Sequence, residues 1–207
     1  MWERMSDLTN TAQGAQIDED LKKFEDNVGT LVETLSSGSR RERQQAAHFL
    51  ALIAKGKPEL VVPYTSDLVE ALNCREAHTR WETLDALTEL VPYESRLCDK
   101  AVSGAETALF DEDSGPLRLA AMRFLCKLGA TTENRSEKVW PLIDEAIQCY
   151  HGDLEFQDML LAVTEFSMGK LDESVRQSLA LRMRFDAENS KGALKKRAAV
   201  IVENCTK

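Results

Sequence analysis

Two sets of apolar residues recur along this chain with one shared period. The first set is Leu31/Leu35, Leu68/Leu72, Ala105/Leu109, Ile143/Ile147 and Leu181/Phe185, in steps of 37, 37, 38 and 38 residues. The second set is Leu50, Leu87, Leu125, Val163 and Ile201, in steps of 37, 38, 38 and 38 residues. A period that two independent sets share predicts a tandem array of about five two-helix units, one set on each helix.

The clearest helix of the array is expected between Arg80 and Leu90. Its inward positions lie three and four residues apart, so they form one buried stripe on a helix of 3.6 residues per turn. These positions are Thr83, Leu84, Leu87 and Leu90. Because β-branched residues do not cluster and aromatic residues are few, we expect an all-α fold without a sheet.

Turn residues divide the chain into units. We expect a mobile tail over residues 1–17, a polar stretch without periodicity, followed by a single repeat domain over residues 18–207. The first helix should begin near Asp18, where acidic residues favour a helix N-terminus. Pro63 should kink the helix of residues 58–72, because proline cannot donate a backbone hydrogen bond. The expected units are about 18–57, 58–97, 98–135, 136–170 and 171–207.

Three second helices carry a common motif. It reads Arg43-x-x-Ala46-Ala47-x-x-Leu50, Arg80-x-x-Thr83-Leu84-x-x-Leu87 and Arg118-x-x-Ala121-Met122-x-x-Leu125. The motif resembles that of the HEAT-repeat family and, more loosely, of its armadillo relatives, over about residues 20–204. This resemblance implies a right-handed α-α superhelix (solenoid) of HEAT-like hairpins, with the second helix of each pair on the concave side. The sequence departs from the pattern at Phe156 and Leu194, which replace the arginine, while the turn aspartate is present as Asp113 and Asp153.

Charge and hydropathy exclude several classes of partner. The formal net charge is -9, which weighs against nucleic acid, because phosphate binding depends on lysine and arginine. No apolar run approaches the roughly 20 residues that span a bilayer, and the N-terminus lacks the apolar core of a secretory signal. We therefore expect neither a nucleic-acid nor a membrane partner.

The cysteines give a prediction about the compartment. Their number is odd, they are widely spaced, and none forms a CxxC pair, so we expect neither a disulfide framework nor a zinc site. Reduced thiols in a cytoplasmic protein are the simplest interpretation. The five are Cys74, Cys98, Cys126, Cys149 and Cys205.

Catalytic constellations are weak. The three histidines fall in three different units, and such an array would not bring them together. Cys74 and His78 have the spacing of a nucleophile and its base, but they lie at a turn without an evident oxyanion donor. The segment from Asp111 to Gly115 hints at a calcium loop, yet Met122 stands where a bidentate glutamate would be needed. We therefore expect no catalytic, metal or cofactor site.

The concave face offers the best candidate for a binding site. In each second helix, the positions two, five and nine residues after the arginine position point away from the buried stripe, and repeat arrays use their concave surface for binding. These positions are Gln45/His48/Leu52, Glu82/Asp85/Glu89, Ala120/Arg123/Lys127, Asp158/Leu161/Glu165 and Lys196/Ala199/Glu203.

From this face we select a partner-binding set. Trp81 borders it and is expected to be partly exposed, whereas Trp140 is expected to pack inside. The alternative is that the charges of the second and third units only pair with one another, as an ion-pair ladder between repeats. The selected residues are Gln45, His48, Trp81, Glu82, Asp85, Glu89, Arg123 and Lys127.

The function that these observations favour is a non-catalytic protein-interaction scaffold, which holds a peptide segment or a helix on its concave face. Two enzymes that use related folds stay open as alternatives: the HEAT-like DNA glycosylases, which would need a cationic concave face, and the phycobilin-lyase type of HEAT protein. A third alternative is a structural homo-oligomer. The oligomeric state does not follow from the sequence.

Overall fold

The computed structural model describes residues 27–207, and helices make up all of the regular secondary structure in that range. The expected tail over residues 1–17 and the expected helix start at Asp18 lie outside the described residues. The helices are α2 (Val28–Ser37), α3 (Arg40–Gly56), α4 (Pro58–Val61), η1 (Val62–Tyr64), α5 (Thr65–Ala71), α6 (Ala77–Cys98), η2 (Asp99–Ala101), α7 (Val102–Leu109), α8 (Gly115–Gly129), α9 (Glu133–Cys149), α10 (Phe156–Ser167), α11 (Glu173–Asn189) and α12 (Gly192–Thr206).

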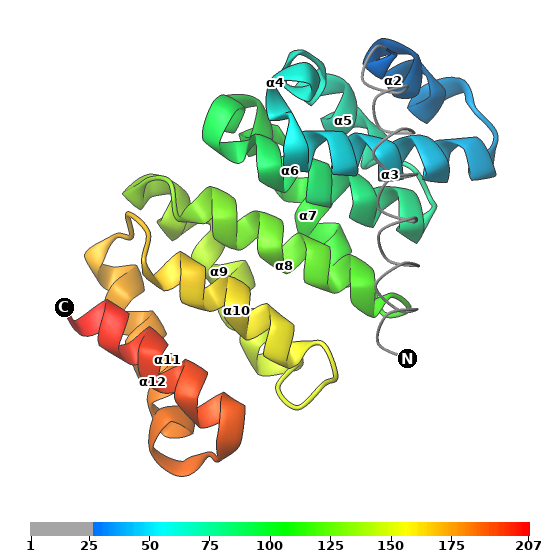
Figure 1. Cartoon of the computed structure of the whole chain (residues 1–207). Coiled ribbons are helices and arrows are strands. Elements are labelled where there is room, and N and C mark those ends of the chain that lie inside the picture. Colours follow the sequence, from blue (N-terminus) through cyan, green and yellow to red (C-terminus); the bar gives the residue numbers. More distant parts are fainter. Residues whose placement is uncertain (1–26) are drawn as a thin grey trace, which may run out of the picture.

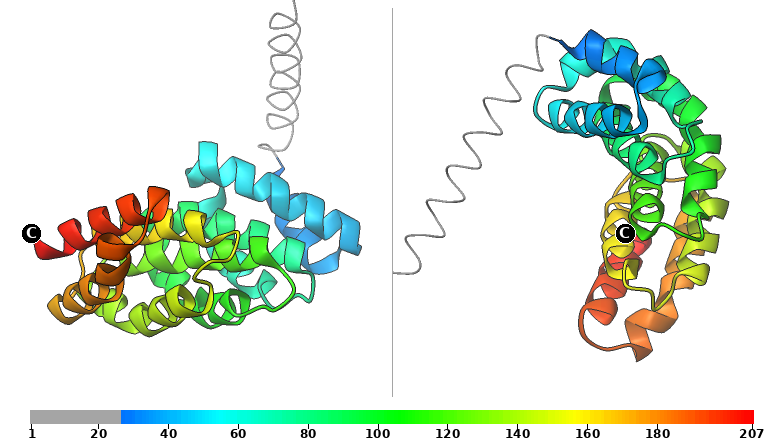
Figure 2. Two further views of the ribbon diagram at one scale, coloured as in Figure 1. Left: turned by 90° about the horizontal axis from the view of Figure 1, so that it is seen from below. Right: turned by 90° about the vertical axis from the view of Figure 1, so that its right-hand side faces the viewer.

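The helices form two layers that wind along one curved axis. One layer, the inner helices, holds α3, α6, α8, α10 and α12, which contact one another in this order (Figure 1). The other layer, the outer helices, holds α2, α5, α7, α9 and α11. In side view the two layers bend into an arc, with the inner helices on its hollow side (Figure 2). The predicted all-α solenoid is confirmed.

The core explains why the chain adopts this arrangement. All five residues of the second apolar set are fully buried, at 0% exposure. The first-set residues of the first four units are buried as well, so each helix pair closes on the next through the predicted stripes. Burying a large aliphatic side chain stabilises the fold by about 1.5–3 kcal/mol, which makes the repeated stripes the main source of stability.

The prediction for the last outer helix was wrong. Leu181 and Phe185 are 66% and 71% exposed, and α11 instead buries Val175, Leu179 and Met183. The backbone N–H of Asp172 donates to Ser136 Oγ at 2.9 Å, which sets the start of α11 against the start of α9 at a step of 36 residues. Leu179 therefore takes the place equivalent to Ile143. The helix has two apolar stripes, and the constant period had indicated the wrong one.

The outer helix of the second unit is interrupted near Pro63, as expected. It divides into α4, the short 3₁₀ turn η1, which contains Pro63, and α5. The inner helix α6 is longer than the sequence indicated, since it continues past Pro92 to Cys98 with a non-helical kink at Glu94. None of the helices in residues 27–207 combines the length and apolar character that a transmembrane span requires.

The motif arginines connect successive units. Arg43 forms an ion pair with Glu76, Arg80 lies 3.7 Å from Asp111, and Arg118 lies 3.5 Å from Glu155. Each arginine thus reaches an acidic residue in the loop of the following unit. The acceptors are not Asp113 and Asp153, the residues that matched the family pattern. Asp113 instead donates its backbone N–H to Asp111 Oδ1, at 3.1 Å.

Candidate functional site

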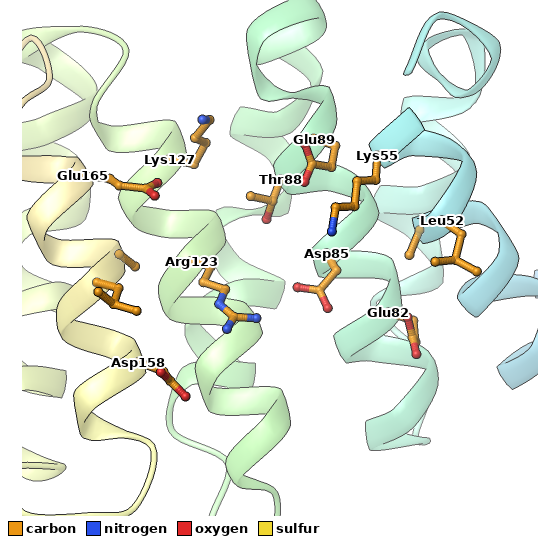
Figure 3. A pocket seen from close by; sticks show the side chains of 13 residues that line it. Leu52, Lys55, Glu82, Asp85, Thr88, Glu89, Arg123, Lys127, Asp158 and Glu165 are labelled. Carbon is orange, nitrogen blue, oxygen red and sulfur yellow. The ribbon is translucent and has the colours of Figure 1, made fainter. Parts of the chain in front are cut away.

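The inner helices enclose a groove of about 660 Å³, which α3, α6, α8 and α10 line together (Figure 3). Part of its lining is apolar, where Ala51, Leu52, Leu161 and Ala162 contribute. The rest is mostly charged, because these helices turn their hydrophobic stripes toward the core and their polar faces toward the hollow side. The charged residues of the groove are Lys55, Glu82, Asp85, Glu89, Arg123, Lys127, Asp158 and Glu165.

The structure brings five of the eight predicted site residues together in this groove. They are Glu82, Asp85, Glu89, Arg123 and Lys127. Gln45 and His48 are exposed on α3 but do not line the groove. Trp81 also lies outside its lining. The predicted inner-face positions Leu52, Asp158, Leu161 and Glu165 line the groove too, whereas Ala120 is buried at 2% exposure, because α8 packs between two neighbours.

Lys55 and Thr88 also line the groove, although they were not predicted from the sequence. Lys55 lies on α3 one turn beyond Leu52, and its ammonium group points toward Asp85 (Figure 3). The helical periodicity that selected Leu52 would have found Lys55 if it had been followed three residues further. Thr88 lies beside Glu89, and its hydroxyl donates to the Leu84 carbonyl at 2.7 Å.

Glu82 is engaged at one edge of the groove. Its carboxylate lies 3.0 Å from His48 Nδ1 of α3 and 3.5 Å from His78 Nε2 of its own helix. The ring of His78 stacks on Trp81, with 4.3 Å between the ring centroids. Trp81 is therefore half-buried, with one side against the core and the other under an imidazole. Its position agrees with the expected partial exposure and favours a packing role.

The basic residues of the groove are not paired. In residues 27–207, neither Arg123 nor Lys127 has a carboxylate within 4.0 Å of its charged nitrogens. Both side chains are exposed, on the groove side of α8. The ion-pair ladder considered from the sequence is thus not formed by direct contacts across α6 and α8, and these charges stay available to a partner.

Asp85 has an unusual proton affinity. Burial is the main cause that raises the pKa of this carboxyl group from 3.8 to about 6; the negative charges of Glu82 and Glu89 act in the same direction, while Arg123 and Lys55 oppose the shift. Burial dominates because the carboxylate loses water in the lining of the groove without gaining a hydrogen-bond donor that would replace it. Ionisation of Asp85 at neutral pH consequently destabilises the folded state.

Replacing Asp85 with asparagine should therefore stabilise the protein at pH 7. Well below pH 4, Asp85 is protonated in both the folded and the unfolded states, so its ionisation costs nothing there, and at pH 4 the cost is still small. As the pH rises from about 4 to 6, the unfolded chain ionises first and the cost appears in the folded state. The gain in unfolding free energy of Asp85→Asn over wild type should be about 1–2 kcal/mol larger at pH 7 than at pH 4, after allowance for partial solvation. Urea titrations at both pH values measure it, and a gain that does not change with pH would contradict this account.

The structure gives little support for catalysis by Cys74 and His78, the nucleophile–base pair that the sequence suggested. The Cys74 thiol donates to the Glu76 carbonyl at 3.7 Å, and burial raises the pKa of Cys74, which disfavours the reactive thiolate. His78, its proposed base, is instead engaged with Trp81 and Glu82. Across the described part of the chain, no group of three or more His, Cys, Asp or Glu side chains is placed to hold a metal ion.

The fold is similar to that of several solved structures. An engineered protein superimposes with a TM-score of 0.71 at 16% identity, over 90% of this chain and 83% of its own. A designed armadillo repeat protein in complex with the peptide (KR)4 gives a TM-score of 0.72 at 16% identity, over 90% of this chain and 86% of its own. The fold is that of an armadillo-like helical repeat array. No family model matches its sequence, and no curated protein matches it either.

The armadillo-like assignment rests on the arrangement of the helices, because identities of this size show the fold alone. A computationally designed armadillo repeat protein for modular peptide recognition gives a TM-score of 0.65 at 17% identity, over 84% of this chain and 80% of its own. The narrower assignment to the HEAT family, which the arginine motif suggested, stays a prediction.

Proposed function

We propose that this protein is a non-catalytic scaffold that holds a peptide segment of a partner protein in its concave groove. The observation that carries the proposal is the groove itself, an open hollow of about 660 Å³ whose basic residues have no carboxylate partner in residues 27–207. Its volume lies within the roughly 300–1,000 Å³ of ligand-binding clefts. Its apolar and charged lining residues offer both the contact area and the orienting groups that a peptide needs.

The comparisons support a peptide as the occupant. Two of the similar structures are designed armadillo repeat proteins, one in complex with the peptide (KR)4 and one designed for modular peptide recognition. The groove of the present chain is lined by five carboxylates and three cationic side chains. That balance suits a peptide that carries positive charge.

The same balance argues against the alternatives. A DNA glycosylase needs cations to neutralise phosphates, and the carboxylates of this groove would repel the backbone of DNA. For a phycobilin lyase or a homo-oligomer, the groove provides no specific support. We further propose a reducing, cytoplasmic location, since all five cysteines are free thiols in the structure.

A peptide selection with a groove-disrupted variant tests the proposal. A random library of ten-residue peptides is selected in parallel on wild-type protein and on the variant Glu89→Lys/Glu165→Lys, which reverses the charge of two exposed side chains on α6 and α10. We expect peptides that bind wild type with micromolar affinity and bind the variant at least about tenfold more weakly.

Two further measurements complete this experiment. Circular dichroism should show that the variant melts within a few degrees of wild type, since both substituted residues are exposed. A fluorescent DNA duplex and a tetrapyrrole serve as competing ligands. Peptides that bind both proteins equally, or a DNA affinity that exceeds every peptide affinity, would refute the proposal.

A further inference from the structure

The charges of the groove alternate from one inner helix to the next. The α6 helix presents Asp85 and Glu89, the α8 helix presents Arg123 and Lys127, and the α10 helix presents Asp158 and Glu165 (Figure 3). We call these pairs the α6 acidic stripe, the α8 basic stripe and the α10 acidic stripe. Because α8 contacts both α6 and α10, the three stripes lie in this order across the groove.

Most charged side chains of the stripes form no ion pair within residues 27–207, so they can interact with a partner. Among residues 27–207, the α8 basic stripe makes no ion pair within 4.0 Å, and neither do Asp85, Glu89, Asp158 and Glu165. Glu82, by contrast, is held by His48 and His78 and is therefore omitted from the α6 stripe. The pKa of Asp85 stays raised, at about 6, even though Arg123 and Lys55 oppose the shift, so an added positive charge near it would be favourable.

The dimensions of the array limit how a peptide can match the stripes. Packed helices lie about 8–10 Å apart. A β-strand places every second side chain on one face, at intervals of about 6.6 Å. A polyproline II segment places every third side chain on one face, at about 9.3 Å. On a concave surface the side-chain ends of neighbouring helices lie closer together than the helix axes. Peptide side chains that are two residues apart and those that are three residues apart can therefore both reach neighbouring stripes.

We propose that the groove binds an extended peptide segment in which one acidic side chain lies between two basic side chains, each two or three residues away. The two basic side chains meet the α6 and α10 acidic stripes, and the acidic side chain meets the α8 basic stripe. Because this charge pattern is symmetric, it suits either direction of the peptide along the groove. The inference rests on the proposed peptide-binding function and adds the charge order of the partner to it.

The charge order also provides discrimination. A segment with only basic residues would place a cation against Arg123 and Lys127, and a like-charge contact in an interface is strongly unfavourable. A segment with only acidic residues would meet two acidic stripes. Selectivity of this kind comes from repulsion of wrong partners as much as from attraction of the right one.

Synthetic peptides of identical composition test the proposal. Fluorescein-labelled Lys-Ser-Glu-Ser-Lys and Lys-Ser-Ser-Glu-Ser-Ser-Lys carry the alternating order, and Lys-Ser-Lys-Ser-Glu and Lys-Ser-Ser-Lys-Ser-Ser-Glu are their scrambled controls. Fluorescence anisotropy at low ionic strength measures the affinity of the full chain for each. We expect at least one alternating peptide to bind about tenfold more tightly than the control of the same composition.

A charge reversal in the protein provides the second arm. The variant Arg123→Glu/Lys127→Glu turns the α8 stripe acidic, and both replaced side chains are exposed. It should prefer Lys-Ser-Lys-Ser-Lys over Lys-Ser-Glu-Ser-Lys by about tenfold, the reverse of the wild-type preference. A gain of affinity for a new peptide cannot result from a loss of folding.

The outcomes separate this inference from the function on which it rests. If alternating and scrambled peptides bind equally well, and the groove variants weaken both, peptide binding in the groove stands and the charge order is wrong. An unchanged preference in the charge-reversed variant would also refute the charge order. If neither these peptides nor those from the random library bind in the groove, both proposals fall.

Discussion

Replacing Leu87 with aspartate should abolish the cooperative unfolding of the array. Leu87 is fully buried, at 0% exposure, at the centre of α6, the helix that packs between α3 and α8. The substitution removes a large apolar side chain and buries a carboxyl group without a partner, which together should cost about 4 kcal/mol or more. That is a large part of the roughly 5–15 kcal/mol by which domains are stable. Because repeat units contact chiefly their neighbours, a defect in this position should separate the first unit from the last three.

Thermal and urea unfolding, followed by circular dichroism, measure this effect. The control is Gln45→Asp, which introduces the same side chain at an exposed position of α3 and should leave the transition within about 0.5 kcal/mol of wild type. A single sharp transition for Leu87→Asp, close to that of the control, would mean that the assigned register of α6 is wrong.

Replacing Arg118 with alanine should destabilise the junction between the third and fourth units by about 2–4 kcal/mol. The Arg118 guanidinium donates to the Asp111 carbonyl at 2.9 Å and to the Glu112 carbonyl at 3.3 Å, and it lies 3.5 Å from Glu155. It also lies over the ring of Tyr150, 5.0 Å from its centroid. Its removal leaves a half-buried carboxylate, two loop carbonyls and an aromatic face without their partner.

Two variants make this prediction specific. Arg123→Ala, on the same helix, removes an exposed arginine and should change the unfolding free energy by less than about 0.5 kcal/mol. Arg118→Lys should recover only part of the loss, because an ammonium group cannot reproduce the planar set of donors and the contact with Tyr150. Urea titration of the three variants measures these differences, and equal stabilities of Arg118→Ala and Arg123→Ala would contradict the prediction.

The inner layer of the fold was predictable because its apolar stripes are unambiguous. Leu50, Leu87 and Leu125 each follow a motif arginine by seven residues, and packing on both sides leaves only one face of these helices exposed. The last outer helix was not predictable in the same way. It offers Leu179 with Met183 and also Leu181 with Phe185, and the choice depends on the bond between Asp172 and Ser136, which no period indicates.

The groove was predictable in its position and only partly in its chemistry. Periodicity placed Asp85 and Arg123 on one face, and the structure brings them to the same groove. It could have paired His78 with Glu82, which lie four residues apart on one helix. It could not show that His48 engages Glu82, nor that burial raises the pKa of Asp85, because both depend on distances between different helices. Such contacts are set by how the units stack, and a single sequence contains no measure of that stacking.

The connections between motif arginines and the following loops have a consequence for the growth of such a chain. Residues 80–117 contain both Arg80 and its counterion Asp111, and Arg118 begins the same arrangement again with Glu155. A gene duplication of these 38 residues would thus supply each new arginine with its own acidic partner and leave no unpaired charge at the junction between the copies. The length of the hollow surface can then evolve in whole-unit steps, so that longer partners become accessible through the number of copies, without redesign of any contact.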